Sequence, residues 1–181
     1  MAITSVCVFL GSARGHGPAA ITAARALGAG LAGRGWTLIY GGASVGLMGE
    51  LAEAALAAGG EVTGVMPIEM ADREIAHRGL TRLDVVASMA ERKDRMFALA
   101  DAFVTLPGGY GTLDELFEAL TGALLGYHHK PIVLVDLDGY FAGLLRFLDD
   151  AMVAGFLRPE YRALLEVVPT PEAALELLAR R

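Results

Sequence analysis

Short apolar runs alternate along the chain with longer segments in which apolar residues recur at helical spacing. The short runs predict strands and the longer segments predict helices. The predicted strands cover residues 5–10, 37–40, 61–66, 83–86, 102–106, 132–135 and 165–168. The predicted helices cover residues 18–33, 46–58, 88–100, 111–125, 140–154 and 171–180. This alternation predicts an α/β, Rossmann-like, doubly wound fold with a mainly parallel sheet and helices on both faces.

The length of the chain suits one compact unit. Its 181 residues predict a single Rossmann-like nucleotide-binding domain over 1–181, which would bury roughly 70% of the surface of the unfolded chain. No linker, internal repeat or low-complexity segment interrupts it. The longest irregular stretch, residues 67–82, lies between the third and fourth strands, and such loops inside compact domains are more often functional than decorative.

Charge and composition narrow the classes of partner. A formal net charge of −6 argues against a nucleic-acid backbone as the ligand, but a small phosphorylated ligand needs only local positive charge. Cys7 is the only cysteine, so we expect neither a disulfide nor a multi-cysteine metal site, and no metal is predicted. No apolar run reaches the ~18 residues of a membrane span, and the start lacks signal-peptide features. We therefore expect a cytoplasmic protein without a membrane partner.

Two glycine-rich segments follow the first two strands. Residues 11–17 begin with Gly11 and Ser12, which could approach a ligand or simply form a turn. Residues 41–49 lead into a helix, where Gly42 could admit a ligand and Gly49 could let the helix pack closely. For both segments, binding and purely structural roles are about equally supported by the sequence.

The strongest local signal follows the fifth strand, where residues 107–112 read Pro-Gly-Gly-Tyr-Gly-Thr and lead into a helix. Successive glycines let backbone N–H groups converge, and the helix dipole favours an anion such as phosphate. Glu115, one turn into the helix, could approach the sugar of a nucleotide-like ligand. For Asp114 we favour the simpler role of complementing the helix dipole. The segment matches neither the Walker pattern nor the dinucleotide fingerprint.

A further candidate lies on the helix after the fourth strand. Met89, Arg92 and Met96 share one face of that helix, so Arg92 is carried inward beside apolar neighbours. An inward arginine needs a carboxylate or a ligand oxygen as its partner, and taken alone a solvated or salt-bridged arginine is the better supported alternative.

Together these segments resemble the Lonely Guy (LOG) family of cytokinin-activating phosphoribohydrolases. The motifs that carry the resemblance are Glu-Arg-Lys at 91–93, Pro-Gly-Gly-Tyr-Gly-Thr-Leu-Asp-Glu at 107–115, the Gly-rich segment 41–49 and Asp-Gly-Tyr at 138–140. The resemblance implies hydrolysis of the N-glycosidic bond of adenosine 5′-monophosphate, or an N6-substituted derivative, to free base and ribose 5-phosphate. It implies no cofactor, and a homodimer with the site near the subunit interface.

Carried over by motif position, the resemblance makes Arg92 and Glu115 the catalytic pair. It assigns substrate contacts to Glu74, Lys93, Gly108, Gly109, Tyr110, Gly111, Thr112, Leu113, Asp114 and Thr121. The glycine-rich segments described above add Gly11, Ser12 and Gly42 as candidates for further contacts. The sequence departs from the family pattern at Ala90, often histidine, and at Gly122 and Leu124, where the family often has tryptophan and glutamine. These positions lie near the expected base pocket, so the preferred base stays open.

Two other functions compete with this hypothesis. Related folds include molybdenum-cofactor carrier proteins, which bind without turnover, and an AMP sensor would likewise bind without releasing adenine. Many relatives carry the label lysine decarboxylase, a reaction that commonly needs a lysine Schiff base with pyridoxal phosphate. Only Lys93 and Lys130 could serve, and Lys93 is part of the Arg-Lys motif while Lys130 directly precedes a strand. We therefore do not expect that activity.

Overall fold

The computed structural model describes residues 2–71 and 75–181. Its strands are β1 (Ser5–Phe9), β2 (Thr37–Tyr40), β3 (Val62–Pro67), β4 (Arg82–Val86), β5 (Ala102–Thr105), β6 (Ile132–Val135) and β7 (Leu165–Val168). Its helices are α1 (Pro18–Ala32), α2 (Gly46–Ala57), α3 (Ile68–Ala71), α4 (Met89–Leu99), α5 (Tyr110–Leu124), α6 (Ala142–Val153), α7 (Pro159–Arg162) and α8 (Pro171–Ala179), with a 3-10 turn, η1, at Leu137–Gly139. Each predicted strand is present within one residue at either end.

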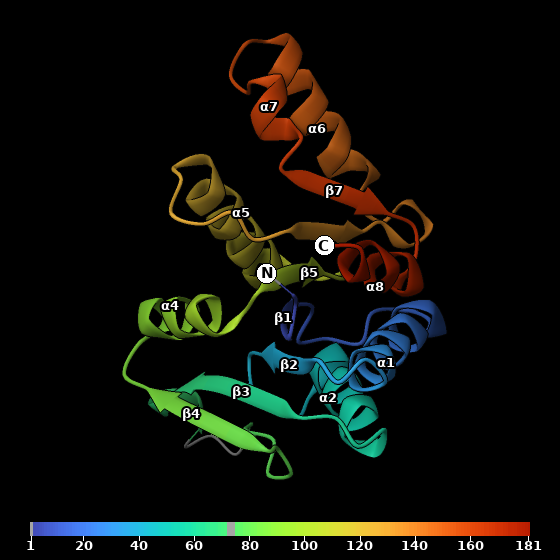
Figure 1. The fold of residues 1–181 in the computed structure, drawn as a ribbon, viewed down its shortest axis with the longest axis vertical. Helices are drawn as coiled ribbons and strands as arrows, with labels where there is room; N and C mark the ends of the chain where they lie inside the picture. Colours follow the sequence, from blue (N-terminus) through green and yellow to red (C-terminus); the bar gives the residue numbers. More distant parts are fainter. Residues whose placement is uncertain (1, 72–74) are drawn as a thin grey trace.

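The strands form one sheet in the order β4-β3-β2-β1-β5-β6-β7, and every pair of neighbouring strands in it is parallel. In Figure 1, α1, α2 and α8 cover one face, whereas α4 and α5 cover the other. The predicted doubly wound α/β fold with helices on both faces is therefore confirmed. The short segments α3 and α7 were not predicted, because a single helical turn carries no readable periodicity.

The central strands are buried on both faces, which explains their nearly continuous apolar sequence. In β1, Val6 and Val8 join the core under α1, α2 and α8, while Cys7 and Phe9 join the core under α4 and α5. Burial raises the pKa of the Cys7 thiol well above its usual value, as expected for an inert core cysteine. The edge strand β4 is the exception, since none of its residues is fully buried.

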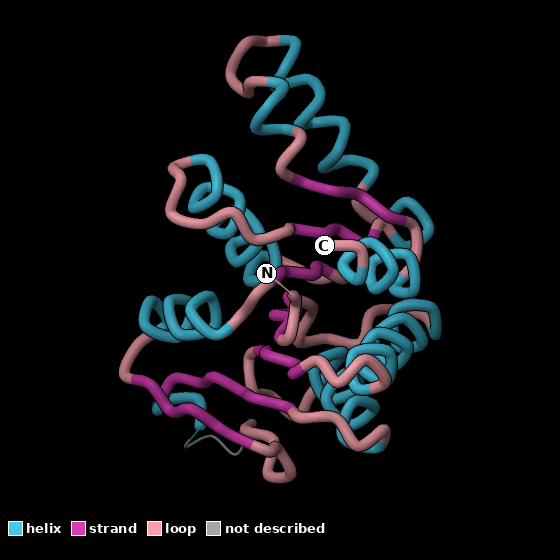
Figure 2. The backbone as a smooth tube through the Cα atoms, viewed as in Figure 1, coloured by secondary structure: helices cyan, strands magenta, loops and turns pink. Residues whose placement is uncertain are grey.

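The direction in which strands are added reverses at β1, which has β2 on one side and β5 on the other. Figure 2 shows the strands following one another along the length of the molecule as one twisted sheet. The backbone N–H of Gly11 donates to the Pro107 carbonyl at 3.1 Å and joins the loops that follow β1 and β5. Ligands of doubly wound sheets bind at such a switch point, beyond the carboxyl ends of the strands.

Candidate active site

The loop between β5 and α5 presents free backbone donors. Gly109 is the N-cap of α5, and no side chain caps it. The carbonyls before the helix are occupied: Gly11 binds that of Pro107, and the Tyr140 hydroxyl donates to that of Gly108 at 2.8 Å. The N–H groups of residues 109–112 make no hydrogen bond to the described part of the chain. The helix start therefore offers several donors and the positive end of its dipole to an anion.

The same loop needs glycine at 108 for packing reasons. A Cβ added to Gly108 would overlap the Thr112 hydroxyl oxygen, and it would lie 2.8 Å from the Gly11 nitrogen. Thr112 is itself buried, so it cannot easily move away. Gly109 and Gly111 face open space, where a ligand can approach the backbone closely.

A cavity of about 520 Å³ opens beside this loop at the switch point. Gly11 and Ser12 line it, as do Gly108 and Gly109, so the structure brings these four predicted contacts together. Tyr140 and Asp138 line it from the β6–α6 connection. Among the described residues that line this cavity, neither Arg92 nor Glu115 appears, so the cavity adjoins the carboxylate site without containing it.

Arg92 is aimed inward by a well-defined helix start. The Ser88 hydroxyl accepts from the Glu91 N–H at 3.1 Å, and the Glu91 carboxylate accepts from the Ala87 N–H at 2.9 Å. The hydroxyl of Ser88 is thus the N-cap, while the Glu91 carboxylate binds the N–H of the residue before the cap, and this variant of the capping box fixes where α4 begins. Arg92 then lies in the first turn, buried at 8% exposure, with Met96 buried one turn later. Met89, however, is half exposed at the first position of α4, so of the two methionines expected beside Arg92 only Met96 is buried.

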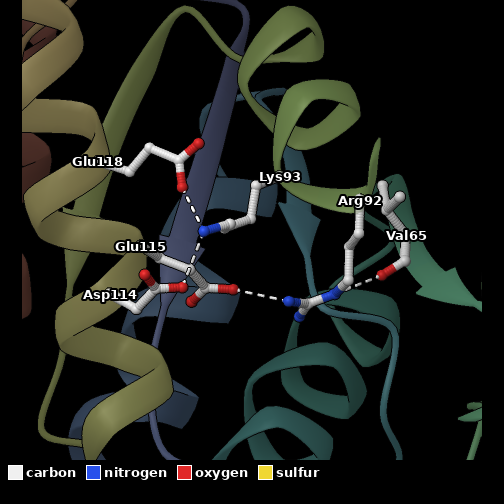
Figure 3. A network of polar contacts seen from close by, with 6 residues as sticks. All are labelled: Val65, Arg92, Lys93, Asp114, Glu115 and Glu118. Carbon is white, nitrogen blue, oxygen red and sulfur yellow. Dashed lines mark hydrogen bonds and ion pairs between the residues drawn. The ribbon is translucent and has the colours of Figure 1, made fainter. Parts of the chain in front are cut away.

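The guanidinium of Arg92 joins two distant segments. Its Nε donates to the carbonyl of Val65 in β3 at 3.0 Å, and its Nη1 donates to Oε1 of Glu115 in α5 at 2.9 Å (Figure 3). Since Glu115 is also buried, at 7% exposure, the two charges form a buried ion pair at the carboxyl ends of the central strands. The predicted pairing of these two residues is thus supported by direct contact.

Burial raises the pKa of Glu115, because a carboxylate loses hydration there, while the neighbouring Arg92 guanidinium opposes the shift. A buried carboxylate with a raised pKa beside an always-charged guanidinium is typical of groups that take part in catalysis. The second oxygen, Oε2, makes no hydrogen bond within the described residues and is available to a substrate hydroxyl or water.

Lys93 lies beside this pair but has its own partners. Its ammonium is 2.9 Å from Asp114 and also contacts Glu118, both on α5 (Figure 3). Hydrogen bonds from Lys93 to Glu118 and Asp114 raise the lysine's pKa and keep it charged. This corrects our expectation for Asp114: it does not simply complement the helix dipole, because it is half of an ion pair that ties α5 to α4.

Lys130 is also occupied, since its ammonium donates to the Phe97 carbonyl at 2.7 Å. Burial lowers the pKa of Lys130. The residue lies just before β6, and its hydrogen bond to Phe97 connects this segment to α4. Both lysines of the chain thus have structural partners. This arrangement does not favour either one as a Schiff-base residue.

The structure gives less support to the remaining predicted contacts. Glu74 lies outside the described residues. Gly42 is buried with φ +80°, so the backbone needs glycine there whether or not a ligand touches it. Thr121 is exposed on α5 and lines a separate cavity of about 150 Å³ with Phe117 and Leu165. Leu113 is half-buried and packs against the core under α4 and α5. The contact roles of all four stay predictions.

Sequence reasoning missed three residues of this region. Glu118 shares Lys93 with Asp114, and its position three residues after Glu115 on a helix was a readable signal. Gly41 matters because a Cβ there would overlap Nη2 of Arg92. Tyr140 reaches the loop between β5 and α5 from 32 residues away, and in the sequence only the Asp-Gly-Tyr motif indicated it.

Two further observations concern the described residues as a whole. In the described ranges 2–71 and 75–181, no group of three or more histidine, cysteine, aspartate or glutamate side chains is arranged to hold a metal ion. No helix in those ranges is both long and apolar enough to cross a membrane.

A parallel sheet with an anion-binding helix start at its switch point, and a buried arginine–glutamate pair beside it, defines a Rossmann-like protein with a site for a nucleotide-like ligand. Residues 48–178 match the family model described as "Possible lysine decarboxylase". The chain is 44% identical over 173 residues to the probable cytokinin riboside 5′-monophosphate phosphoribohydrolase LOGL2 of Oryza sativa subsp. japonica, covering 96% of this chain and 71% of that protein.

A second relative, cytokinin riboside 5′-monophosphate phosphoribohydrolase LOG7 of Arabidopsis thaliana, is 43% identical, over 96% of this chain and 80% of its own length. The chain belongs to the LOG family of phosphoribohydrolases, and the family and enzyme class predicted from its motifs are confirmed.

The fold is shared more widely. The molybdenum cofactor binding protein of Rippkaea orientalis superimposes with a TM-score of 0.74 at 23% identity, covering 99% of this chain and 98% of that protein. The molybdenum cofactor carrier protein of Chlamydomonas reinhardtii gives a TM-score of 0.71 at 25% identity, with 98% of each chain covered. At this level of identity these similarities show a shared fold.

Proposed function

We propose that this protein hydrolyses the N-glycosidic bond of a nucleoside 5′-monophosphate of the adenosine or N6-substituted adenosine type, releasing the base and ribose 5-phosphate. The observation that carries the proposal is the buried Arg92–Glu115 pair one helical turn from the free amides at the start of α5. The anion site fixes the 5′-phosphate, and the ribose then lies over Glu115.

The chemistry follows from the charges in place. Breaking the bond between C1′ and the base nitrogen leaves an oxocarbenium-like sugar, whose positive charge the Glu115 carboxylate stabilises. The same carboxylate orients the water that adds its oxygen to C1′. Arg92 keeps Glu115 in place and ionised, and its permanently protonated guanidinium suits this electrostatic role better than proton transfer. The water contributes its hydroxyl to C1′, and its other proton balances the one that the departing base takes up.

We also propose that a second copy of the chain packs against the exposed apolar side chains of α5. Phe117, Leu124 and Leu125 are 37%, 39% and 54% exposed, although all three are large and apolar. Thr121 is also exposed on α5, so in such a dimer its predicted substrate contact would be made to the substrate bound by the other copy. Light scattering after size-exclusion chromatography should give a dimer for the wild type and a monomer for Leu124→Asp/Leu125→Asp. We propose separately that the protein is cytoplasmic.

The deciding experiment incubates the purified protein with AMP and, separately, with N6-isopentenyladenosine monophosphate, and separates the products by chromatography. We expect free base and ribose 5-phosphate in equal amounts from the wild type and none from Glu115→Ala. The ratio of the two rates ranks the bases. Tight binding of either nucleotide without release of base would contradict the proposal and favour a carrier or a nucleotide sensor.

A further inference from the structure

Tyr140 is the one described side chain that reaches the phosphate-binding loop from the β6–α6 connection by a hydrogen bond. Its hydroxyl donates to the Gly108 carbonyl at 2.8 Å, although the tyrosine is 57% exposed and needs no partner for burial reasons. The contact spans 32 residues and lies at the wall of the 520 Å³ cavity.

The chain before Tyr140 is shaped to hold the ring in this position. Asp138 has φ 52°, the one positive φ of a non-glycine residue in the described chain, and Gly139 follows with φ 74°. The Asp136 carboxylate accepts from the Phe141 N–H at 2.7 Å. Phe141 is buried and packs edge-on against the Tyr140 ring, with centroids 4.8 Å apart. Unfavourable backbone conformations of this kind persist only where the surrounding structure maintains them.

The Gly108 carbonyl has a special position in the loop. It belongs to the peptide between two glycines, which can rotate at low cost because neither side carries a Cβ. In a planar trans peptide the carbonyl and the N–H point in opposite directions. Rotation of this peptide would turn the Gly109 N–H away from the other donors at the start of α5 and bring a carbonyl oxygen, which repels anions, towards them.

We infer that Tyr140 is a positioning residue for phosphate binding: its hydroxyl holds the Gly108–Gly109 peptide in the orientation that presents the Gly109 N–H to the 5′-phosphate. This inference rests on the proposed function, because it assumes that a phosphate occupies the start of α5. It adds the residue that keeps this donor set ordered before the ligand arrives.

Tyr140→Phe removes only the hydroxyl and keeps the ring against Phe141. We expect KM for AMP, the Kd for AMP measured by calorimetry, and the Ki of inorganic phosphate each to rise about 3- to 10-fold, the loss of one ordinary hydrogen bond. Turnover at saturating AMP should stay within about twofold, because Glu115 and Arg92 are untouched. Tyr127→Phe is the matched control, since Tyr127 is exposed and its hydroxyl bonds to no described residue.

Four outcomes are distinguished by these measurements. A joint rise of the AMP Kd and the phosphate Ki in Tyr140→Phe, with the control unchanged, supports the positioning role. Unchanged constants, or a fall in turnover without a change in KM, would overturn it even if the wild type releases adenine. If the wild type binds AMP without turnover, the proposed reaction fails, but the calorimetric Kd of the two variants still tests Tyr140. Absence of AMP binding by the wild type overturns both.

Discussion

Arg92 and Glu115 are 23 residues apart in the sequence, yet their side chains meet at 2.9 Å with only 10% of each exposed. A buried ion pair is a poor device for stability, because both charges lose hydration, and removing one partner leaves the other uncompensated. The pair lies one turn from the unpaired backbone N–H groups at the start of α5, and the second oxygen of Glu115 makes no hydrogen bond to a described residue. Its position therefore favours a role in the reaction.

Glu115→Gln tests that role with the smallest change of shape. The amide oxygen can still accept from Arg92, but the negative charge that stabilises the sugar cation is gone. We expect turnover of AMP to fall by about 10²- to 10⁴-fold while the Kd for AMP changes by less than about threefold. Release of adenine and calorimetric binding measure the two quantities separately. Equal losses in both would mean that Glu115 positions the nucleotide and does not act on the reacting bond.

The acid side of the pH–rate profile should report the ionisation of Glu115. The carboxylate is the active form, so activity rises with pH as Glu115 loses its proton. Because burial raises the pKa of Glu115, the midpoint of the acid limb of kcat/KM should lie above the pKa of an ordinary glutamate, which is about 4.3. Arg92→Met removes the charge that opposes this shift, so its limb should move to still higher pH.

Arg92→Lys serves as the control for that profile, because it keeps the positive charge and should shift the limb less than Arg92→Met. Rates of adenine release between about pH 4 and 9 are sufficient to locate both limbs. A limb that stays in place or moves to lower pH in Arg92→Met would show that another group controls the profile.

Gly41 should matter mainly through Arg92. A Cβ at position 41 would overlap Nη2 of Arg92 and approach the Met48 sulfur at 3.2 Å. Gly41→Ala should therefore push the guanidinium away from Val65 and Glu115, and we expect kcat/KM to fall at least about 10-fold, with a loss of about 1–3 kcal/mol of stability. In an Arg92→Lys background, where Nη2 is absent, the same substitution should cost little more.

A double-mutant cycle over Gly41→Ala and Arg92→Lys measures this non-additivity directly. Gly143→Ala in α6 is the matched control, because a Cβ there meets nothing within 4 Å and alanine favours the helix. If the effects of the two substitutions simply add, Gly41 does not act through the position of the Arg92 guanidinium.

The sequence predicted the sheet well because its central strands are buried on both faces and read as continuous apolar runs. The inward direction of Arg92 followed from helical spacing, and the free amides followed from the glycines at 108, 109 and 111. The partners that complete the site could not be read in this way. The Val65 carbonyl, the space left by Gly41 and the hydroxyl of Tyr140 reach their targets across 27 to 51 positions, and only tertiary packing brings them together.

For Asp114, a local rule gave an explanation that left out its long-range partner. Acidic residues in a first helical turn commonly complement the dipole, and nothing local to α5 revealed that Lys93 lies across from it. The family resemblance did not indicate this ion pair either, because it gave both Lys93 and Asp114 as substrate contacts.

A last prediction concerns stability. Asp101, at the start of β5, accepts hydrogen bonds through Oδ2 from the N–H and hydroxyl of both Thr4 and Ser5. Burial alone would raise the pKa of Asp101, but these bonds outweigh it and lower the pKa. A lowered folded-state pKa contributes stability that is fully present above the unfolded pKa of about 3.9 and is lost as pH falls through the folded value.

Asp101→Asn should therefore lower the free energy of unfolding by about 1 kcal/mol at neutral pH, since it weakens the charge-assisted bonds without removing the acceptor. The difference from wild type should shrink below about pH 4, where the wild-type carboxyl becomes protonated and resembles the amide. Urea unfolding at both pH values measures it, with Asp94→Asn as the control, because Asp94 is exposed and bonds to no described residue. A difference that is the same at both pH values would mean that Asp101 holds the start of β1 by shape and not by charge.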